Sequence, residues 1–245
     1  TQGNHVIRKA LITGGSGGIG QAIAQRLAAA GIRVWVHYHS NPEAAAATVE
    51  TIQGQGGKAT ALGFDVSDWE ATRASLEGLL ADEGAMDIVV HNAGITDDAA
   101  FPGMQQSQWQ RVIDTSLNGF FHVTRPLIMP MIRQRWGRIV SIASIAALHG
   151  NRGQTNYAAA KAGLIGASRS LAREVASRGI CVNVVAPGYV DTGMIADIPA
   201  GTIRELVPMQ RSGRADEIAA VVAFLCSDDT AYMTGEVLNV SGGII

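Results

Sequence analysis

Residues 13–20 read Thr13-Gly-Gly-Ser-Gly-Gly-Ile-Gly20, and they decide the fold of this 245-residue chain. A short apolar segment, Val6 to Thr13, precedes them, and a helical pattern from Gln21 to Ala30 follows until Gly31 ends it. A strand, a glycine-rich turn and a helix, in that order, are the context of a dinucleotide-binding fingerprint. The glycines let the backbone approach a pyrophosphate, and the helix offers free N–H groups and its positive dipole end. The alternative, a flexible linker, does not sit between a strand and a helix.

The alternation of strands and helices continues along the chain and predicts a single α/β domain over residues 1–245. Further strands are expected at Arg33–Tyr38, Ala59–Phe64, Met86–Val90, Arg138–Ala143, Cys181–Ala186 and Val237–Val240. Helices are expected at Pro42–Gln53, from a cap at Ser67 or Asp68 to Glu83, at Ser107–Gly119 with a continuation to Arg135, at Thr155–Arg178 and at Asp216–Cys226. Pro126 and Pro130 should bend or interrupt the continuation. The fold class is therefore a Rossmann-type, doubly wound parallel sheet of about seven strands flanked by helices.

Composition excludes several classes of protein. A hydrophobic content of 47% suffices for one core, and a net charge of −2 gives no basic field for nucleic acid. The two cysteines, Cys181 and Cys226, lie in apolar contexts and are interpreted as buried thiols, so neither a metal site nor a disulfide framework is expected. No secretory or membrane-spanning segment is apparent, and a cytoplasmic protein is expected.

A second motif, Asn-Tyr-Ala-Ala-Ala-Lys at residues 156–161, carries a chemically useful pair. Tyr157 and Lys161 are four residues apart in a predicted helix, so both side chains emerge on the same face. A lysine cation held near a phenol favours the phenolate. The spacing alone is also compatible with a tyrosine packed on the core and a lysine that reaches solvent.

Several motifs together resemble the classical short-chain dehydrogenase/reductases over essentially the whole chain. They are Thr13 to Gly20, His91-Asn92-Ala93-Gly94, Ser144, Tyr157-x-x-x-Lys161 and Pro187-Gly188. Within that family, residues 150–166, 171–179 and 184–188 resemble the 3-oxoacyl-(acyl carrier protein) reductases, with acetoacetyl-CoA reductases as the nearest competitors.

The resemblance implies roles for individual residues. Tyr157 would protonate the substrate carbonyl oxygen, and Lys161 would raise the acidity of Tyr157 and hold the nicotinamide ribose. Ser144 would hydrogen-bond the carbonyl oxygen and stabilise the developing alkoxide. Cofactor contacts are expected from Gly14, Ser16, Gly17, Gly18, Ile19, Gly20, Tyr38, His39, Asp65, Val66, Asn92, Ala93, Gly94, Tyr157, Lys161, Pro187, Gly188, Val190 and Thr192.

One position departs from the family pattern. An asparagine usually completes a catalytic tetrad through a water relay, and counting from Asn92 places Ser116 at that position. Asn118 is close by, but two residues along a helix point to nearly opposite faces. Because a serine hydroxyl can still bind a water, a weakened or altered relay is expected.

The residues after the second predicted strand bear on the choice of cofactor. NAD-dependent members usually carry an acid there to hold the ribose hydroxyls, whereas this chain reads His37-Tyr38-His39-Ser40-Asn41. Gly17, however, stands where many NADP-dependent relatives have Lys or Arg. The missing acid favours NADPH.

The resemblance therefore predicts NADPH-dependent reduction of a 3-oxoacyl thioester on acyl carrier protein, in fatty acid or related polyketide or polyene biosynthesis. The alternatives are an acetoacetyl-CoA-type, alcohol or steroid dehydrogenase, and a weakly active cofactor-binding subunit of a hetero-oligomer. A homotetramer is implied, built on residues 107–135, residues 154–178 and the last strand. Arg135 and Arg178 match carrier-docking arginines of relatives and are expected near the mouth of the site, and residues 189–213 are the expected substrate lid.

Overall fold

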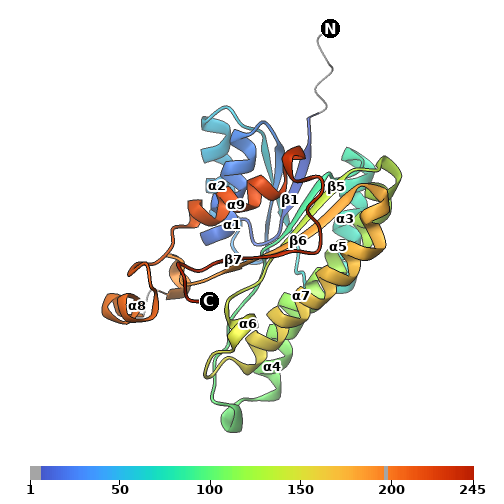
Figure 1. Cartoon of the computed structure of the whole chain (residues 1–245). Coiled ribbons are helices and arrows are strands. Elements are labelled where there is room, and N and C mark those ends of the chain that lie inside the picture. The colour runs from blue at the N-terminus through green and yellow to red at the C-terminus, as the bar shows by residue number, and fades with distance from the viewer. Residues whose placement is uncertain (1–6, 196–197) are drawn as a thin grey trace.

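A computed structural model of the chain describes residues 7–195 and 198–245. Its centre is a seven-stranded, entirely parallel sheet in the order β3-β2-β1-β4-β5-β6-β7 (Figure 1). The strands are β1 (Lys9–Ile12), β2 (Arg33–Tyr38), β3 (Ala59–Gly63), β4 (Ile88–His91), β5 (Gly137–Ile142), β6 (Ile180–Pro187) and β7 (Val237–Val240). The predicted fold class is confirmed, including the number of strands.

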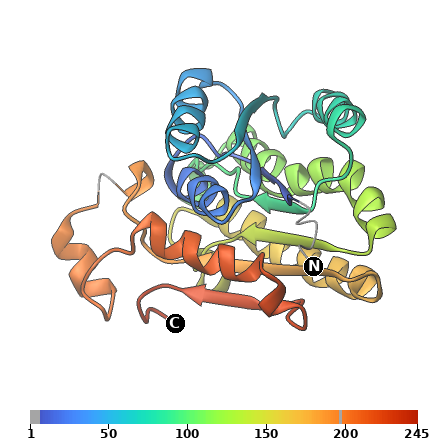
Figure 2. The same cartoon turned by 90° about the horizontal axis from the view of Figure 1, so that it is seen from above.

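Helices cover both faces of the sheet, which is why the central strands are buried along their whole length (Figures 1 and 2). One apolar core lies under α1 (Gly18–Ala29), α2 (Pro42–Gly54) and α9 (Ala215–Leu225). The other lies under α3 (Trp69–Glu83), α5 (Gly119–Gln134) and α7 (Thr155–Val175). The remaining helices are α4 (Gln106–Ile113), α6 (Ala146–His149) and α8 (Ala200–Leu206).

The helical region before β5 differs from the prediction. Of the predicted bend or interruption at Pro126 and Pro130, the interruption is wrong, since both prolines lie inside the continuous helix α5. Each proline removes only one backbone donor, and the side that packs on the core, including Val123 and Leu127, holds the helix in place. The irregularity occurs earlier, where residues Asp114–Asn118 form a π-helical turn between α4 and α5.

Two short helices, α6 and α8, were not predicted, because four and seven residues carry too little periodicity. The choice between caps for α3 is settled by Asp68, whose carboxylate accepts from the N–H of Ala71 at 3.0 Å.

The order of the strands fixes where ligands can bind. The chain runs outward from β1 to β3 and then returns to place β4 on the other side of β1. In such sheets the crevice beyond the carboxyl ends of the strands, at this reversal, is the binding site. The glycine-rich segment follows β1 at this point, and His91-Asn92-Ala93-Gly94 begins at the end of the neighbouring β4.

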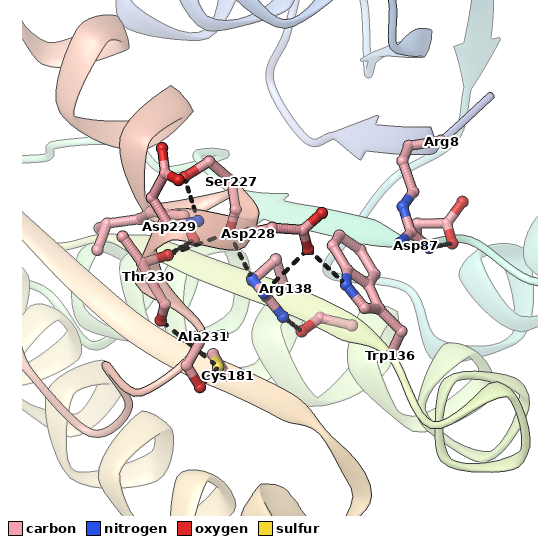
Figure 3. A network of polar contacts seen from close by, with 12 residues as sticks. Arg8, Asp87, Trp136, Arg138, Cys181, Ser227, Asp228, Asp229, Thr230 and Ala231 are labelled. Carbon is pink, nitrogen blue, oxygen red and sulfur yellow. Dashed lines mark hydrogen bonds and ion pairs between the residues drawn. The ribbon is translucent and has the colours of Figure 1, made fainter. Parts of the chain in front are cut away.

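A polar network lies at the amino ends of the strands, opposite the carboxyl ends (Figure 3). Arg8 and Arg138 place their guanidinium carbons 3.6 and 4.4 Å from the centre of the Trp136 ring. Asp228 accepts from the indole N–H at 2.9 Å and pairs with Arg138 at 3.6 Å. Arg138 is only 2% exposed, so its partners compensate a buried charge. Within the described residues, no helix is both long and apolar enough to cross a bilayer.

Candidate active site

The glycine-rich segment is shaped by close backbone contacts at two of its glycines. Gly14 has a φ of 59°, in the left-handed region that glycine tolerates. A Cβ on Gly20 would lie 2.1 Å from the carbonyl oxygen of Gly14, so no side chain fits there. Helix α1 starts at Gly18, with no side chain capping its first turn and no acidic residue in it. Its N–H groups and positive dipole end are therefore available to an anion.

The ends of β1 and β4 are joined below this loop. The Thr13 hydroxyl accepts from the backbone N–H groups of Asn92 and Ala93, both at 3.0 Å. The Asn92 amide donates to the carbonyl oxygens of Thr13 at 3.1 Å and Gly14 at 2.9 Å. Asn92 thus holds the loop from beneath. Thr13 was quoted only as part of the motif; its role at the junction was not predicted.

His37 supports the same loop from the side. Its Nδ1 accepts from the Gly14 N–H at 3.0 Å, and its Nε2 lies 2.9 Å from the carbonyl oxygen of Phe64. Accepting at Nδ1 leaves the proton on Nε2, which donates to Phe64. Burial lowers the pKa of His37 to about 4, so the ring is neutral near pH 7. This contact was missed at the sequence level, because histidine at that position carries no recognised signature.

The four residues expected at the adenosine end of the groove lie at the carboxyl ends of β2 and β3. Tyr38 packs against Gly63, and His39 is exposed, with its Nε2 3.6 Å from the Asp65 carboxylate. Val66 differs, because its side chain packs in the core under α5 and its carbonyl oxygen lies 2.8 Å from Nδ1 of His122. The side chain of Val66 is therefore not available to a ligand.

Tyr157 and Lys161 both lie in the first two turns of α7, and both are buried, at 8% and 3% exposure. The Lys161 nitrogen is 5.7 Å from the centre of the Tyr157 ring, and it donates to the carbonyl oxygen of Ile142 at 2.8 Å. Asn156 fixes the start of this helix, since its amide donates to the carbonyl oxygen of Asp97 at 3.0 Å and its Oδ1 accepts from the Tyr157 N–H at 2.8 Å.

The electrostatics of this pair differ from the expectation that Lys161 makes Tyr157 more acidic. Burial raises the pKa of Tyr157; the Ser144 hydroxyl offsets this in part, and Asp98 adds to it. Burial also lowers the pKa of Lys161 to about 8. Removal from water is the largest effect on the pKa of each group. The Lys161 ammonium donates its hydrogen bond to the carbonyl oxygen of Ile142.

Ser144 is the second residue after β5, and its side chain lies beside Tyr157. Its Oγ accepts from the N–H of Ala146 at 3.1 Å as the short helix α6 begins. This bond leaves the hydroxyl proton free to be donated. Ser144 therefore serves as a cap and, at the same time, keeps a donor beside Tyr157.

Ser116 lies in the π-helical turn with its Oγ buried and without any hydrogen-bond partner in the described structure. A Cβ on Gly94 would lie 3.0 Å from the Lys161 nitrogen and 3.3 Å from the Ser116 hydroxyl, so both groups flank Gly94. Asn118 instead donates to the Asp114 carboxylate at 2.6 Å. A buried hydroxyl without a partner, next to a lysine, is a suitable place for a water.

The carboxyl end of β6 forms the far wall of the groove. Gly188 lies against Ser241, because a Cβ on Gly188 would be 2.8 Å from the Cα of Ser241. Thr192 approaches the glycine-rich segment, with its methyl carbon 3.4 Å from a Cβ placed on Gly18. Thr192, after Pro187-Gly188, therefore lies close to the loop after β1.

The predicted lid, residues 189–213, is a loop whose two ends are tied together. Val190 forms a β-bridge with Gly213, and the Gly213 N–H donates to the carbonyl oxygen of Tyr189 at 2.8 Å. Residues 196 and 197 lie outside the described part. The stretch also contains α8.

A cavity of about 480 Å³ lies between this lid and the segment after Ser144. It is lined by Ile145, His149, Gly150, Asn151, Arg152, Tyr189, Leu206 and Ile244. Its apolar and polar sides suit a substrate that is apolar at one end. None of these residues was predicted as a contact, and Ile244 is distant in sequence from the motifs.

The comparison that decides the family is a match of residues 14–245 to the family model described as "Enoyl-(Acyl carrier protein) reductase". The chain belongs to the short-chain dehydrogenase/reductase family. Among similar members of that family, the 3-oxoacyl-[acyl-carrier-protein] reductase FabG of Escherichia coli is 47% identical over 96% of this chain and 96% of its own. The protein of that name from Aggregatibacter actinomycetemcomitans is 46% identical over 96% and 98%. Nodulation protein G of Azospirillum brasilense is 44% identical over 96% and 97%.

The resemblance that the motifs indicated is thereby confirmed for the family. The family model and the relatives name two different reactions, reduction of a carbon–carbon double bond and reduction of a ketone. As a member of the short-chain dehydrogenase/reductase family, the chain carries the glycine-rich segment and the Tyr157–Lys161 pair at one edge of one sheet.

Proposed function

We propose that this protein is an NADPH-dependent oxidoreductase that reduces a 3-oxoacyl thioester, carried on acyl carrier protein, to the 3-hydroxyacyl thioester. The observation that carries the proposal is the buried pair of Tyr157 and Lys161 beside the Ser144 hydroxyl, at the carboxyl edge of the sheet. The similarity to proteins named 3-oxoacyl reductases, over nearly their full length, supports the ketone as the reducible group. The whole chain, residues 1–245, acts in this proposal as one dinucleotide-binding domain.

The groove fits a dinucleotide. The uncapped start of α1 and the closely packed Gly14 and Gly20 form the cradle for a pyrophosphate. Asn92 to Gly94 supply the floor, and Thr192 and Gly188 supply the wall. No acidic residue follows β2 among Tyr38, His39, Ser40 and Asn41, which supports NADPH. When bound, NADPH supplies the hydride.

The side chains of this site supply the proton and the stabilisation of charge. Because burial raises the pKa of Tyr157, the phenol holds its proton until the carbonyl oxygen becomes more basic during reduction. Ser144 donates to the same oxygen and stabilises the developing alkoxide. Lys161 stabilises the phenolate left behind, and the buried Ser116 hydroxyl orders a water that returns a proton.

Four other functions remain as alternatives. Reduction of CoA thioesters uses the same chemistry with a different carrier, and so does an alcohol or steroid dehydrogenase. Reduction of an enoyl thioester is the reaction named in the family description. A weakly active cofactor-binding subunit of a hetero-oligomer is motivated by Ser116 alone, and the presence of Ser144, Tyr157 and Lys161 argues against it.

The structure corrects the expected location of the carrier-docking arginines. Arg135 and Arg178 come just before β5 and β6, at the amino ends of the strands, whereas Tyr157 lies at the carboxyl edge. Tyr157 is near the start of the 21-residue helix α7, and Arg178 lies in the short turn after its end. At 1.5 Å per residue the two are about 30 Å apart. These arginines are therefore not at the mouth of their own site.

A symmetric oligomer reconciles the two observations. If α7 and α5 pack antiparallel against their copies across a two-fold axis, the end of α7 in one subunit lies beside the start of α7 in the other. We propose that Arg135 and Arg178 then guide the carrier to the site of the neighbouring subunit within a homotetramer. Exposed apolar side chains support two contact faces, Phe121 and Met129 on α5, and Tyr232 and Ile245 around β7.

The test is the oxidation of NADPH with four substrates, namely acetoacetyl-acyl carrier protein, acetoacetyl-CoA, a steroid ketone and a crotonyl thioester. The proposal expects the highest kcat/KM with the carrier-bound ketone and no turnover of crotonyl thioester. A preference for the crotonyl substrate would replace the proposal with an enoyl reductase. Equal rates with the CoA thioester and the carrier-bound thioester would contradict the proposal that acyl carrier protein delivers the substrate.

A further inference from the structure

A second cavity, of about 520 Å³, lies at the amino ends of β1, β2 and β3. The candidate active site is at the carboxyl ends, and β2 alone separates the two ends by about 17 Å at 3.3 Å per residue. The lining of the cavity includes Lys9, Arg33 and Lys58. No acidic side chain occurs among the described residues that line it, although the net charge of the chain is −2. Positive charge is therefore concentrated at a hollow that the proposed reaction does not use.

The three cations come from three neighbouring strands and form one row. Lys9 pairs with Arg33 in the register of β1 and β2, and Val34 pairs with Ala59 in that of β2 and β3. Lys58 directly precedes Ala59, so it lies opposite Arg33. Register partners on adjacent parallel strands point to the same face of the sheet, and like charges in such positions repel each other. The row therefore favours the binding of an anion.

Within the described part of the chain, an acid compensates only one of these charges. The Arg33 guanidinium donates to both oxygens of the Glu83 carboxylate, at 2.7 and 2.8 Å. Lys9 donates to the backbone carbonyl oxygen of Glu83, which carries no formal charge, and keeps the other donors of its ammonium. Lys58 is exposed, and no carboxylate of a described residue pairs with it. Two ammonium groups with free donors thus remain at the cavity.

The use of lysine at these positions is selective. Lys9, Lys58 and Lys161 are the only lysines of the sequence, and its other cations of fixed charge are arginines. Lys161 belongs to the candidate active site, and the other two both line this cavity. A lysine ammonium is a compact point charge with rotatable donors, which suits a phosphate group. Exposed cations placed for solubility alone would not gather in this way.

The charge and the lining define the class of ligand. A phosphate monoester carries a charge of about −1.5 to −2 near pH 7, which matches two ammonium groups. A carboxylate or a sulfate ester would neutralise only one of them. Ile7 and Ala59 provide apolar surface, and the Thr60 hydroxyl is a further donor. The volume lies within the range of about 300–1,000 Å³ that is usual for small-molecule sites, so an organic group fits beside the phosphate.

We propose that this cavity binds a small organic phosphate monoester. Lys9 and Lys58 bind the phosphate, and the apolar side of the cavity contacts the organic group. Arg33, which Glu83 holds in place, adds positive potential between the two lysines. The site is separate from the dinucleotide groove, so its occupation does not depend on the proposed function.

Isothermal titration calorimetry of the full chain tests this, with inorganic phosphate and phenyl phosphate as probes in a phosphate-free buffer. Phenyl sulfate has the same ring with a single charge and shows whether the second charge matters. Lys58→Gln removes one cation, Lys58→Arg keeps it, and Thr60→Tyr fills the cavity without a change of charge. The matched control is Arg169→Gln, at an exposed cation of α7. The start of α1 also attracts phosphate, but it is identical in every variant, so differences between variants report the cavity.

Phenyl phosphate should bind about tenfold or more tightly than inorganic phosphate, because its ring leaves water, and about tenfold more tightly than phenyl sulfate. Lys58→Gln should weaken the binding of both phosphate probes by about tenfold, as expected for the loss of a hydrogen bond between charged groups. Lys58→Arg should retain most of the affinity. Thr60→Tyr should remove the advantage of phenyl phosphate over inorganic phosphate, and Arg169→Gln should behave as the wild type.

Equal affinities of the Lys58→Gln and wild-type proteins for phenyl phosphate would overturn the proposal, because the probe would then bind elsewhere. An equal loss in Arg169→Gln and Lys58→Gln would also overturn it, since the attraction would then follow the net charge of the chain. The same holds if Thr60→Tyr leaves the affinity for phenyl phosphate unchanged, or if the wild-type protein does not bind this probe at millimolar concentration.

Discussion

The nitrogen of Lys161 lies 5.7 Å from the centre of the Tyr157 ring, and both side chains are almost completely buried. Lys161 donates a hydrogen bond to the carbonyl oxygen of Ile142 at 2.8 Å. The Lys161 ammonium is therefore directed to a backbone carbonyl oxygen. Tyr157 keeps a protonated phenol, which is the form that a proton donor requires.

Replacement of Tyr157 by phenylalanine should remove the proton donor and leave the shape of the groove unchanged. We expect kcat for ketone reduction to fall by about 100-fold or more, with little change in the dissociation constant of NADPH. Steady-state kinetics and fluorescence titration of NADPH measure the two quantities. Tyr232→Phe, at a fully exposed tyrosine, is the matched control. A loss of only a few-fold in kcat would remove Tyr157 from this role.

The buried charge of Lys161 should lower the free energy of unfolding. Burial lowers its pKa from 10.5 to about 8, so below pH 8 a buried charge is maintained at a cost of about 3 kcal/mol. Between pH 8 and 10.5 the unfolded chain binds more protons than the folded one, and the unfolding free energy should rise with pH.

Lys161→Met should therefore raise the unfolding free energy at pH 7 by about 1–2 kcal/mol while abolishing activity, since the loss of the bond to Ile142 offsets part of the gain. Urea denaturation at pH 7 and pH 10 measures this, with the exposed Lys58→Met as control. The advantage of the variant should shrink at pH 10. An equal effect at both pH values would show that the charge of Lys161 is not its cause.

Two buried histidines should make the protein sensitive to acid. Burial lowers the pKa of His37 from 6.5 to about 4 and that of His91 from 6.5 to about 3. Above pH 6.5 both histidines are neutral in the folded and the unfolded chain, and their contribution to stability is complete. As the pH falls towards 4 and 3, the histidines of the unfolded chain take up protons before those of the folded chain, so this contribution is lost. The unfolding free energy should fall by about 1.4 kcal/mol per pH unit for each histidine in this window.

Denaturation curves between pH 7 and pH 4.5 test this prediction. His91→Asn should reduce the slope, and the exposed His149→Gln should leave it unchanged. If the slope of His91→Asn equals that of the wild type, other groups cause the loss of stability.

The pattern of apolar residues was sufficient to predict the strands of the sheet, because the residues that delimit a strand lie next to it in the sequence. Runs such as Arg33–Tyr38 and Val237–Val240 are observed with the predicted bounds, since glycine, proline and polar residues delimit them. The π-helical turn was not predictable, because it depends on how Ser116 and Gly119 pack rather than on propensity. Contacts across the sheet, such as Gly14 with His37, likewise depend on strand order.

The motifs located the candidate site but not its electrostatics. The i and i+4 spacing predicted that Tyr157 and Lys161 share a face of one helix. It could not show that burial opposes the attraction between them, because burial depends on every element packed around α7. The location of Arg178 was misjudged for a related reason, since a residue at the end of α7 is distant from one at its start.

Ser116 provides a fourth prediction. Its hydroxyl is buried without a partner and flanks Gly94 together with Lys161. A longer amide reaches further toward a relay water, so Ser116→Asn should maintain or raise kcat. Single-turnover and steady-state rates measure this, with Ser116→Ala as the comparison that removes the hydroxyl. A collapse of kcat in Ser116→Asn with an unchanged circular dichroism spectrum would assign the serine a role of its own.

Carrier docking provides the last prediction. Arg135 and Arg178 are exposed and lie at the ends of α5 and the turn after α7, where cations are also favoured by the helix dipole. Arg135 has a structural role as well, since its guanidinium donates to the carbonyl oxygen of Ser177 at 3.1 Å. A dipole or structural role affects every substrate equally, whereas a docking role affects only the carrier-bound one.

Arg135→Glu with Arg178→Glu should therefore raise KM for acetoacetyl-acyl carrier protein by about tenfold or more and leave KM for an N-acetylcysteamine thioester nearly unchanged. The matched control is Arg26→Glu, an exposed cation in the last turn of α1. Because the arginines are distant from their own Tyr157, the effect also depends on the neighbouring subunit.

Mixed oligomers of Arg135→Glu/Arg178→Glu chains with Tyr157→Phe chains separate the two cases. If docking serves the neighbour, the active Tyr157 sites of the first chain are supplied by intact arginines of the second, and a low KM for the carrier substrate returns. If docking serves the same subunit, every active site retains the defective arginines and KM stays high.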